Sequence, residues 1–82
     1  MTAQHCLVGY DRKTDAEKFS QPVPESVLSE LRDIVGFDDN DPSAYGSYKL
    51  SYTQAKHVAG KARIKKHLPE ELSFFLEAYA DD

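Results

Sequence analysis

The stretch "PESVLSELRDIVGF" at 24–37 constrains the fold most, because it carries a complete set of helix signals. Pro24 suits the first turn of a helix, and Glu25 complements the positive end of the helix dipole. Gly36 can take the left-handed conformation that ends many helices. The apolar residues recur at helical spacing: Val27, Leu28, Leu31, Ile34 and Val35. The stretch therefore predicts an amphipathic helix over 24–37.

Two β-prone stretches precede this helix. Residues 5–10 and 16–23 are joined by the polar "DRKTD" at 11–15, a connection of the length found in hairpins. One side of the first stretch carries Cys6, Val8 and Tyr10. In the second stretch, Pro22 has no N–H to donate to a neighbouring strand. The pattern predicts an N-terminal hairpin whose second strand lies at an edge of the sheet.

A second helix is predicted at about 52–62. It follows the stretch "DDNDPSAYGSYK" at 38–49, whose aspartates, proline and glycine predict a loop, with a brief extended run at 48–51. Ser51 and Gln54 have the spacing of a capping box. The apolar residues that follow at helical spacing are mostly alanines: Ala55, Val58, Ala59 and Ala62. Such a helix can pack closely against a neighbour while burying little apolar area.

The final segment, 68–82, carries signals for both helix and strand. Leu68, Leu72, Phe75, Leu76 and Tyr79 recur at helical spacing, which favours a helix over 70–79. The aromatic-rich "SFFLEAY" favours a strand, and an isolated hairpin needs a third strand or a covering helix to be stable in water. We favour a turn of helix at 69–72 followed by a strand at 73–79.

Together these elements predict an α+β fold, with a small antiparallel sheet packed against two helices. The N-terminal hairpin and the C-terminal strand form the sheet, and both helices lie on one side of it. A chain of 82 residues makes one domain, 1–82, which folds alone or with a copy of itself. The residues expected to be largely buried are Val8, Leu28, Leu31, Ile34, Val58 and Leu76.

The order of elements, with "YKLSYTQA" after the acidic loop and "FFLEAYA" at the end, resembles a group of small uncharacterised bacterial domains. Some of these domains are associated with toxin and immunity gene neighbourhoods. The resemblance implies that the last segment is a strand of the sheet. It transfers no catalytic residue to any position of this chain.

The cysteine count and the hydropathy pattern exclude several classes of protein. A single cysteine, Cys6, leaves no internal disulfide, and no charged segment followed by a long apolar run opens the chain. A reducing, cytoplasmic location is therefore expected. The longest apolar run, "FFL" at 74–76, is far shorter than the roughly 20 residues that a membrane-spanning helix needs. We expect a soluble protein without a membrane segment.

No pattern of metal ligands or catalytic groups stands out. The aspartates at 38–41 do not match a calcium-binding EF-hand, because the twelfth position counted from Asp38 is Lys49 and not glutamate. His5 and Cys6 have no further ligands at zinc-site spacing. No nucleophile is accompanied by a marked base or oxyanion site. We therefore expect no metal, no cofactor and no enzymatic activity.

The charge of the chain is divided unevenly along the sequence. The stretch "KHVAGKARIKKH" at 56–67 carries five of the ten basic residues and no acidic one. The rest of the chain has the other five basic residues and all fourteen acidic ones, a balance of −9. Solvent-facing lysines on a helix and cations near its C-terminal end explain the basic residues without a ligand. The chain is nevertheless strongly bipolar.

Two functional hypotheses follow from this bipolar charge. The first is a non-catalytic, immunity-like or antitoxin-like protein, monomeric or homodimeric, that binds a basic surface of another protein through Asp38, Asp39, Asp41, Tyr45 and Tyr48. Exposed loop charges of this kind are expected to contribute little to stability. The alternative is a small nucleic-acid-associated regulatory module that uses Lys56, Lys61, Arg63, Lys65 and Lys66. Nucleic acid is the less favoured partner, because no stacking aromatic accompanies these cations.

Overall fold

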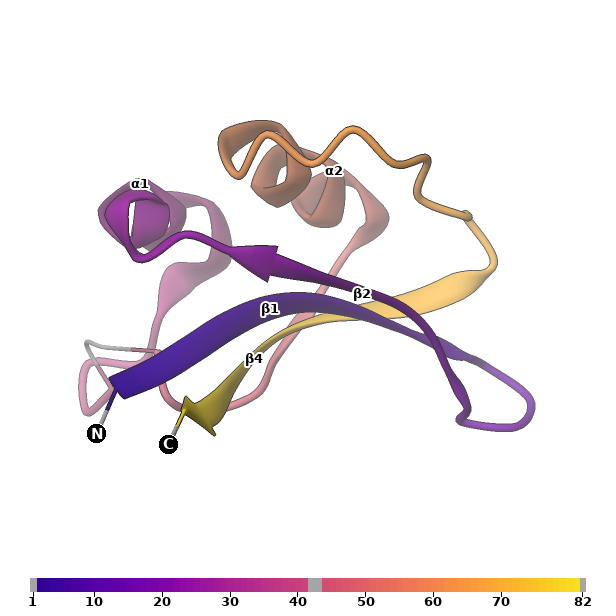
Figure 1. The fold of residues 1–82 in the computed structure, drawn as a ribbon, viewed down its shortest axis with the longest axis horizontal. Coiled ribbons are helices and arrows are strands. Elements are labelled where there is room, and N and C mark those ends of the chain that lie inside the picture. Colours follow the sequence, from indigo (N-terminus) through magenta and orange to yellow (C-terminus); the bar gives the residue numbers. More distant parts are fainter. Residues whose placement is uncertain (1, 42–43, 82) are drawn as a thin grey trace.

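The computed structural model describes residues 2–41 and 44–81, and it has an antiparallel sheet covered by helices on one side (Figure 1). The four strands are β1 (Thr2–Asp11), β2 (Glu17–Val23), β3 (Tyr48–Leu50) and β4 (Leu72–Asp81), in the order β2-β1-β4-β3. This confirms the predicted α+β class. It also confirms that the second strand of the hairpin lies at an edge. Residues 1, 42, 43 and 82 of the predicted domain 1–82 lie outside the described residues.

The terminal segment is a strand, as favoured from the sequence. β4 pairs antiparallel with β1 along its whole length, from Leu72 opposite Asp11 to Asp81 opposite Thr2. The backbone N–H of Leu72 donates to the carbonyl of Pro69 at 3.3 Å, so a turn precedes the strand. β4 also pairs with β3, which places it inside the sheet. Because β1 pairs with the backbone of the whole strand and β3 with residues 74–76, the strand is more favourable here than the helix that the apolar spacing also permits.

The first helical segment, residues 25–36, is less regular than predicted. It consists of a 3₁₀ turn η1 (Glu25–Val27), a short α-helix α1 (Leu28–Leu31) and a wider π-helical turn η2 (Arg32–Gly36). The prediction of one helix over 24–37 was therefore wrong in its regularity. The side chain of Gln54 donates to the carbonyl of Ile34 at 3.0 Å, which gives that carbonyl a partner from the neighbouring helix. Gly36 ends the segment with a φ of 76°, as expected.

The second helix, α2 (Tyr52–Lys61), begins with the predicted capping box. The Ser51 hydroxyl accepts a hydrogen bond from the Gln54 backbone N–H at 3.1 Å, and the Gln54 side chain accepts one from the Ser51 N–H at 2.8 Å. Ala55, Val58 and Ala59 are buried against the sheet. The helix therefore presents its small side chains inward and its lysines outward.

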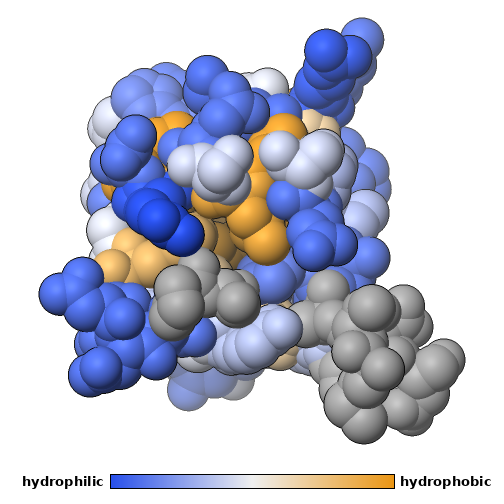
Figure 2. Space-filling view, turned by 90° about the vertical axis from the view of Figure 1, so that its left-hand side faces the viewer, coloured by the Kyte–Doolittle hydropathy of each residue, from blue (hydrophilic) through white to orange (hydrophobic). Residues whose placement is uncertain are grey.

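The core lies between the helices and the sheet. Leu31, Val58 and Leu76 are fully buried, as predicted. Leu28 and Ile34 are only partly buried, against prediction, because the irregular first helical segment leaves part of its apolar stripe at the surface. Figure 2 faces the side of the molecule that carries α1, and it shows apolar surface among hydrophilic side chains there. This side of the helical layer is incompletely covered.

Gly9 permits the closest approach within the core. A Cβ atom at this position would lie 2.9 Å from the ring of Phe74 and 3.1 Å from Cβ of Phe19. These two rings meet edge to face, with centroids 5.7 Å apart. A side chain at position 9 would separate them. The glycine therefore allows β1 to lie directly under the aromatic part of the core.

Val8 is fully buried, as predicted, although it lies on the other face of β1 from the helices. Its paired neighbours on that face are Ser20 in β2 and Phe75 in β4. Directly paired side chains of neighbouring strands stand together on one face. Val8 is thus covered from within the sheet layer and not by a helix.

Candidate functional site: the acidic loop and the open side of the sheet

The acidic loop, defined as the described residues 38–41 and 44–47, is organised around the carboxylate of Asp41. One carboxylate oxygen accepts the backbone N–H of Tyr45 at 2.8 Å, and the other accepts the backbone N–H of Gly46 at 2.8 Å. The second oxygen also accepts the hydroxyl of Tyr48 at 2.7 Å. These hydrogen bonds, first those from Gly46 and Tyr48, lower the pKa of Asp41 below its usual value. Asp41 therefore holds the loop in shape.

Tyr48, at the start of β3, joins the loop to the core. Its ring packs against Phe37 with centroids 5.4 Å apart, and its hydroxyl oxygen accepts the backbone N–H of Asp38 at 3.1 Å. Partial burial raises the pKa of the Tyr48 hydroxyl. Asp41 is not one of the exposed loop charges that the sequence predicted, because it is only partly exposed and its carboxylate accepts three hydrogen bonds. Asp38 and Asp39 are exposed.

Tyr45 is the most exposed large hydrophobic residue among the described residues, with 64% of its surface accessible. Its ring stacks near that of His5, at 6.3 Å between centroids and an interplanar angle of 17°. His5 is buried, and its Nε2 lies 3.0 Å from the carbonyl oxygen of Ala44, which has a φ of 56°. The loop thus exposes the Tyr45 ring to solvent, while the buried His5 contacts the loop backbone at Ala44.

The open side of the sheet, opposite the helices, carries a second group of aromatic and acidic side chains. Tyr10 and Phe75 meet edge to face at 5.7 Å between centroids. The Tyr10 and Tyr79 hydroxyls donate to the same oxygen of Glu77, at 2.8 and 2.6 Å. These hydrogen bonds to a carboxylate raise the pKa values of both tyrosines. Tyr79 is 43% exposed.

The open side is continuous with the acidic loop. The Ser47 hydroxyl donates to the other oxygen of Glu77 at 3.3 Å, so the last residue of the loop contacts the centre of the aromatic group. Burial raises the pKa of the Cys6 thiol, and the negative charges of Glu17 and Glu77 raise it further. Lys49 stands opposite Phe75 at the β3 edge. The combined surface is therefore aromatic and predominantly acidic.

Sequence reasoning brought only part of this surface together. The alternation of β4 separates Phe74, Leu76 and Ala78 from Phe75, Glu77 and Tyr79, as a strand over 73–79 predicts. The sequence pattern did not indicate that Glu77 accepts hydrogen bonds from Tyr10 and Ser47, which are distant from it in the sequence. The signal that could have pointed there is the lone carboxylate between two aromatic rings on the same face of a strand.

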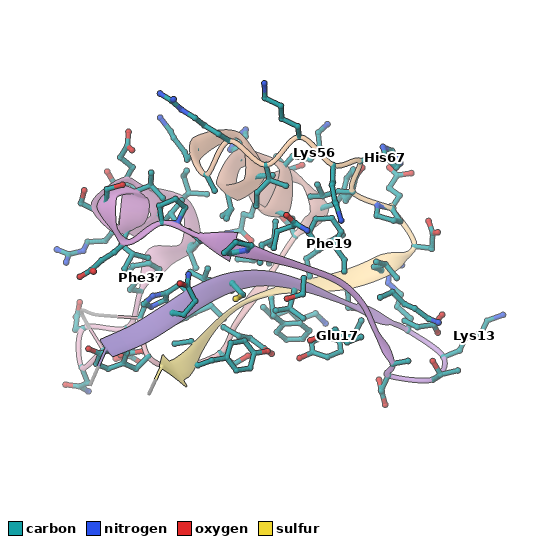
Figure 3. All side chains as sticks on the ribbon, in the orientation of Figure 1. Lys13, Glu17, Phe19, Phe37, Lys56 and His67 are labelled. Atoms are coloured by element: carbon teal, nitrogen blue, oxygen red, sulfur yellow. The ribbon has the colours of Figure 1, made fainter. Side chains whose placement is uncertain are left out.

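The basic residues lie on the other side of the molecule. Lys56 stands above α2, whereas Glu17 lies on the opposite side of the sheet (Figure 3). The Lys56 ammonium lies 5.6 Å from the centroid of the Tyr52 ring, and Lys61 pairs with Glu30 at 3.5 Å. Arg63, Lys65 and Lys66 follow the end of α2, and all three are exposed. The structure thus separates the two predicted sets of site residues.

Arg63 occupies the left-handed position after α2, with a φ of 58°. The backbone N–H of Ile64 donates to the carbonyl of Ala59 at 2.9 Å, and that of Arg63 donates to Gly60 at 3.2 Å. This pair of hydrogen bonds is a Schellman motif, in which glycine is the usual residue at the left-handed position. The conformation is costly for any residue with a Cβ atom.

Within residues 2–41 and 44–81, no group of three or more metal-ligating side chains comes together. In the same ranges, no helix is long and apolar enough to cross a membrane.

The structure thus defines a small α+β domain with an acidic, aromatic surface on one side and a basic segment on the other. The chain belongs to the family described as domain of unknown function (DUF7683), whose model matches residues 4–77. No curated protein and no solved structure matches the chain.

Proposed function

We propose that the chain is a non-catalytic binding domain that docks a basic surface of another protein on the acidic loop and the open side of the sheet. The observation that carries the proposal is Tyr45, a 64% exposed ring on a loop that Asp41 holds in place. An exposed aromatic side chain on a prepared backbone is typical of binding surfaces, because little conformational entropy is lost when it is covered. Tyr79, 43% exposed, is an exposed aromatic side chain on the open side of the sheet.

Charge selects the kind of partner. Glu77 accepts hydrogen bonds from Tyr10 and Tyr79, and Glu17 stands opposite Tyr10. Asp38 and Asp39 are exposed in the acidic loop. Outside 56–67 the chain has five basic and fourteen acidic residues. Two copies of the chain placed open side to open side would bring these carboxylates together, which is unfavourable. A basic partner instead gains electrostatic attraction and faster association. The complement of this surface is therefore a basic protein surface.

An immunity-like or antitoxin-like inhibitor in the cytoplasm is the form of this function that we favour. Such an inhibitor covers a basic enzyme surface with acidic and aromatic side chains. In this arrangement Tyr45, Asp38 and Asp39 contact the partner, while Asp41 and Tyr48 position the loop. The role needs no catalytic group in the chain itself.

The proposal is tested with the protein encoded by the neighbouring gene, immobilised for kinetic binding measurements at two salt concentrations. We expect Tyr45→Ala to lower affinity at least about tenfold, as truncation of a central aromatic contact does. We expect Asp39→Lys to slow association and to weaken its dependence on salt. The control replaces Lys65 and Lys66 by Gln, which leaves an acidic binding surface untouched. No binding by the wild-type chain, or equal loss in the control, would contradict the proposal.

The nucleic-acid hypothesis is tested in parallel by fluorescence anisotropy with generic RNA and DNA at two salt concentrations. It requires that replacing Lys61, Arg63, Lys65 and Lys66 by Gln abolishes binding and its steep salt dependence. The stretch 56–67 carries no stacking aromatic residue beside these cations, which disfavours this hypothesis. Wild-type binding at moderate salt that is lost in the Gln variant would replace the protein-binding proposal.

A further inference from the structure

A groove runs between the first helical segment (residues 25–36) and α2, on the side of the molecule away from the acidic surface. It consists of two hollows, of about 510 and 540 Å³, and Gly60 and Lys61 line both of them. Val27, Glu30 and Arg63 also line the first hollow, and Ile34, Lys56 and His57 the second. Each hollow thus combines an apolar wall with cationic side chains.

Gly60 keeps the groove open. It is an exposed residue within α2, and a Cβ atom built at this position would have no other atom within 4 Å. Glycine in a helix interior is unfavourable relative to alanine, and no contact within the chain requires it here. Its effect is that the backbone of α2 is accessible from outside between the two hollows. A side chain of a partner can approach the helix closely at this point.

The charged residues of the groove favour an anionic occupant. Lys56, Lys61 and Arg63 line it, and Glu30 is the single carboxylate among the lining residues of the two hollows. Glu30 pairs with Lys61 at 3.5 Å, and both side chains are about half exposed, at 52% and 49%. An exposed pair of this kind is weak, so a carboxylate of a ligand can replace Glu30 at Lys61.

We propose that this groove binds an acidic peptide segment of a partner protein, with an apolar side chain over Gly60 and carboxylates on Lys56, Lys61 and Arg63. The apolar walls formed by Val27 and Ile34 suit a peptide better than nucleic acid, which would need exposed aromatic rings for stacking. This site is separate from the acidic surface, and it holds or fails independently of the function proposed above.

The test uses ¹⁵N-labelled protein titrated with a short peptide of alternating Glu and Leu, followed by backbone amide shifts. A peptide with Gln in place of Glu serves as the control ligand. We expect saturable shifts at Gly60 and Lys61 with the acidic peptide and none with the Gln peptide. Shifts confined to the acidic loop or the hairpin would overturn the proposal.

Three variants distinguish binding in the groove from nonspecific electrostatic attraction of the peptide. Gly60→Leu fills the groove without changing charge, and we expect it to weaken binding by at least about tenfold, a change of about 1.4 kcal/mol. Glu30→Gln removes the competing carboxylate, and we expect tighter binding. Lys13→Gln, at the tip of the hairpin (Figure 3), removes a distant charge and leaves affinity unchanged.

If Gly60→Leu binds the acidic peptide as well as the wild type does, the attraction is only electrostatic and the groove is not a site. If a labelled single-stranded RNA displaces the peptide, and Gly60→Leu retains the RNA, the basic residues serve nucleic acid instead. Circular dichroism of Gly60→Leu and of Gly60→Ala is the control for retention of the helix, which we expect in both variants. Lys61→Glu, which reverses a charge at the centre of the groove, is a second test and should abolish binding.

Discussion

The acidic loop and the basic segment, residues 56–67, are both charged stretches at the end of a helical element, yet the chain uses their charges differently. In the acidic loop, the carboxylate of Asp41 accepts hydrogen bonds from Tyr45, Gly46 and Tyr48. In the basic segment, Arg63 occupies a backbone conformation that its side chain disfavours. The comparison shows that charge in a sequence does not reveal whether a side chain contributes to folding. It predicts that Asp41→Asn destabilises the fold, whereas Arg63→Gly stabilises it.

The largest expected effect on stability distinguishes the helix-covered side of the sheet from its open side. Phe74 and Phe75 are neighbours in β4, but Phe74 is buried under the helices and Phe75 stands on the open side. We expect Phe74→Ala to lower the free energy of unfolding by about 3–5 kcal/mol, a large share of the total for a small domain. We expect Phe75→Ala to cost about 1–2 kcal/mol, because its ring is only partly buried.

Urea denaturation of both variants measures this difference. The milder Phe74→Leu keeps the comparison measurable if Phe74→Ala does not fold. Equal losses at the two positions would mean that the open side is as much a core as the helix side, and it would remove the physical basis for calling it a binding surface.

The second prediction concerns Asp41, whose pKa is lowered in the folded protein by hydrogen bonds to its carboxylate. A lowered pKa means stabilisation that is present above the unfolded value of about 4 and lost as the pH falls through the folded value. Asp41→Asn retains one acceptor oxygen and loses the charge. We therefore expect a lower melting temperature than the wild type at pH 7, with a difference that shrinks as the pH falls below about 4.

Asp39→Asn is the matched control for this prediction, because Asp39 is an exposed carboxylate of the same loop. Its melting temperature should follow that of the wild type at every pH. If the difference in melting temperature between Asp41→Asn and the wild type stayed constant down to pH 2, the shape of the Asp41 side chain, and not its charge, would stabilise the loop.

The third prediction has the smallest expected effect, and here the substitution, in the basic segment, is expected to stabilise the protein. Arg63→Gly removes a positive charge, and it relieves the left-handed conformation at a φ of 58°. We expect the free energy of unfolding to rise by about 1 kcal/mol. Lys61→Gln, which breaks the exposed pair with Glu30, is the control and should change stability by less than about 0.5 kcal/mol. If Arg63→Gly destabilises the protein, the arginine side chain contributes to the fold and the comparison between the two regions fails.

Local signals in the sequence were sufficient wherever the interacting groups are close along the chain. The capping box of Ser51 and Gln54, the left-handed stop at Gly36 and the alternation of Phe74 and Phe75 all depend on residues within a few positions of each other. The hairpin and its edge strand follow from turn length and Pro22 for the same reason. These local features are enough to predict the α+β class from the sequence alone.

Only the tertiary structure decided which of the competing signals prevailed. The segment 72–81 becomes a strand because β1 offers it backbone partners along its whole length and β3 offers them at 74–76, which no local pattern reveals. The first helical segment becomes irregular where Gln54, from another helix, binds the carbonyl of Ile34. Glu77 joins the loop to the open side through Ser47 and Tyr10, at sequence separations of 30 and 67 residues. Such contacts exist only after the chain has folded, because loop closure brings their partners together.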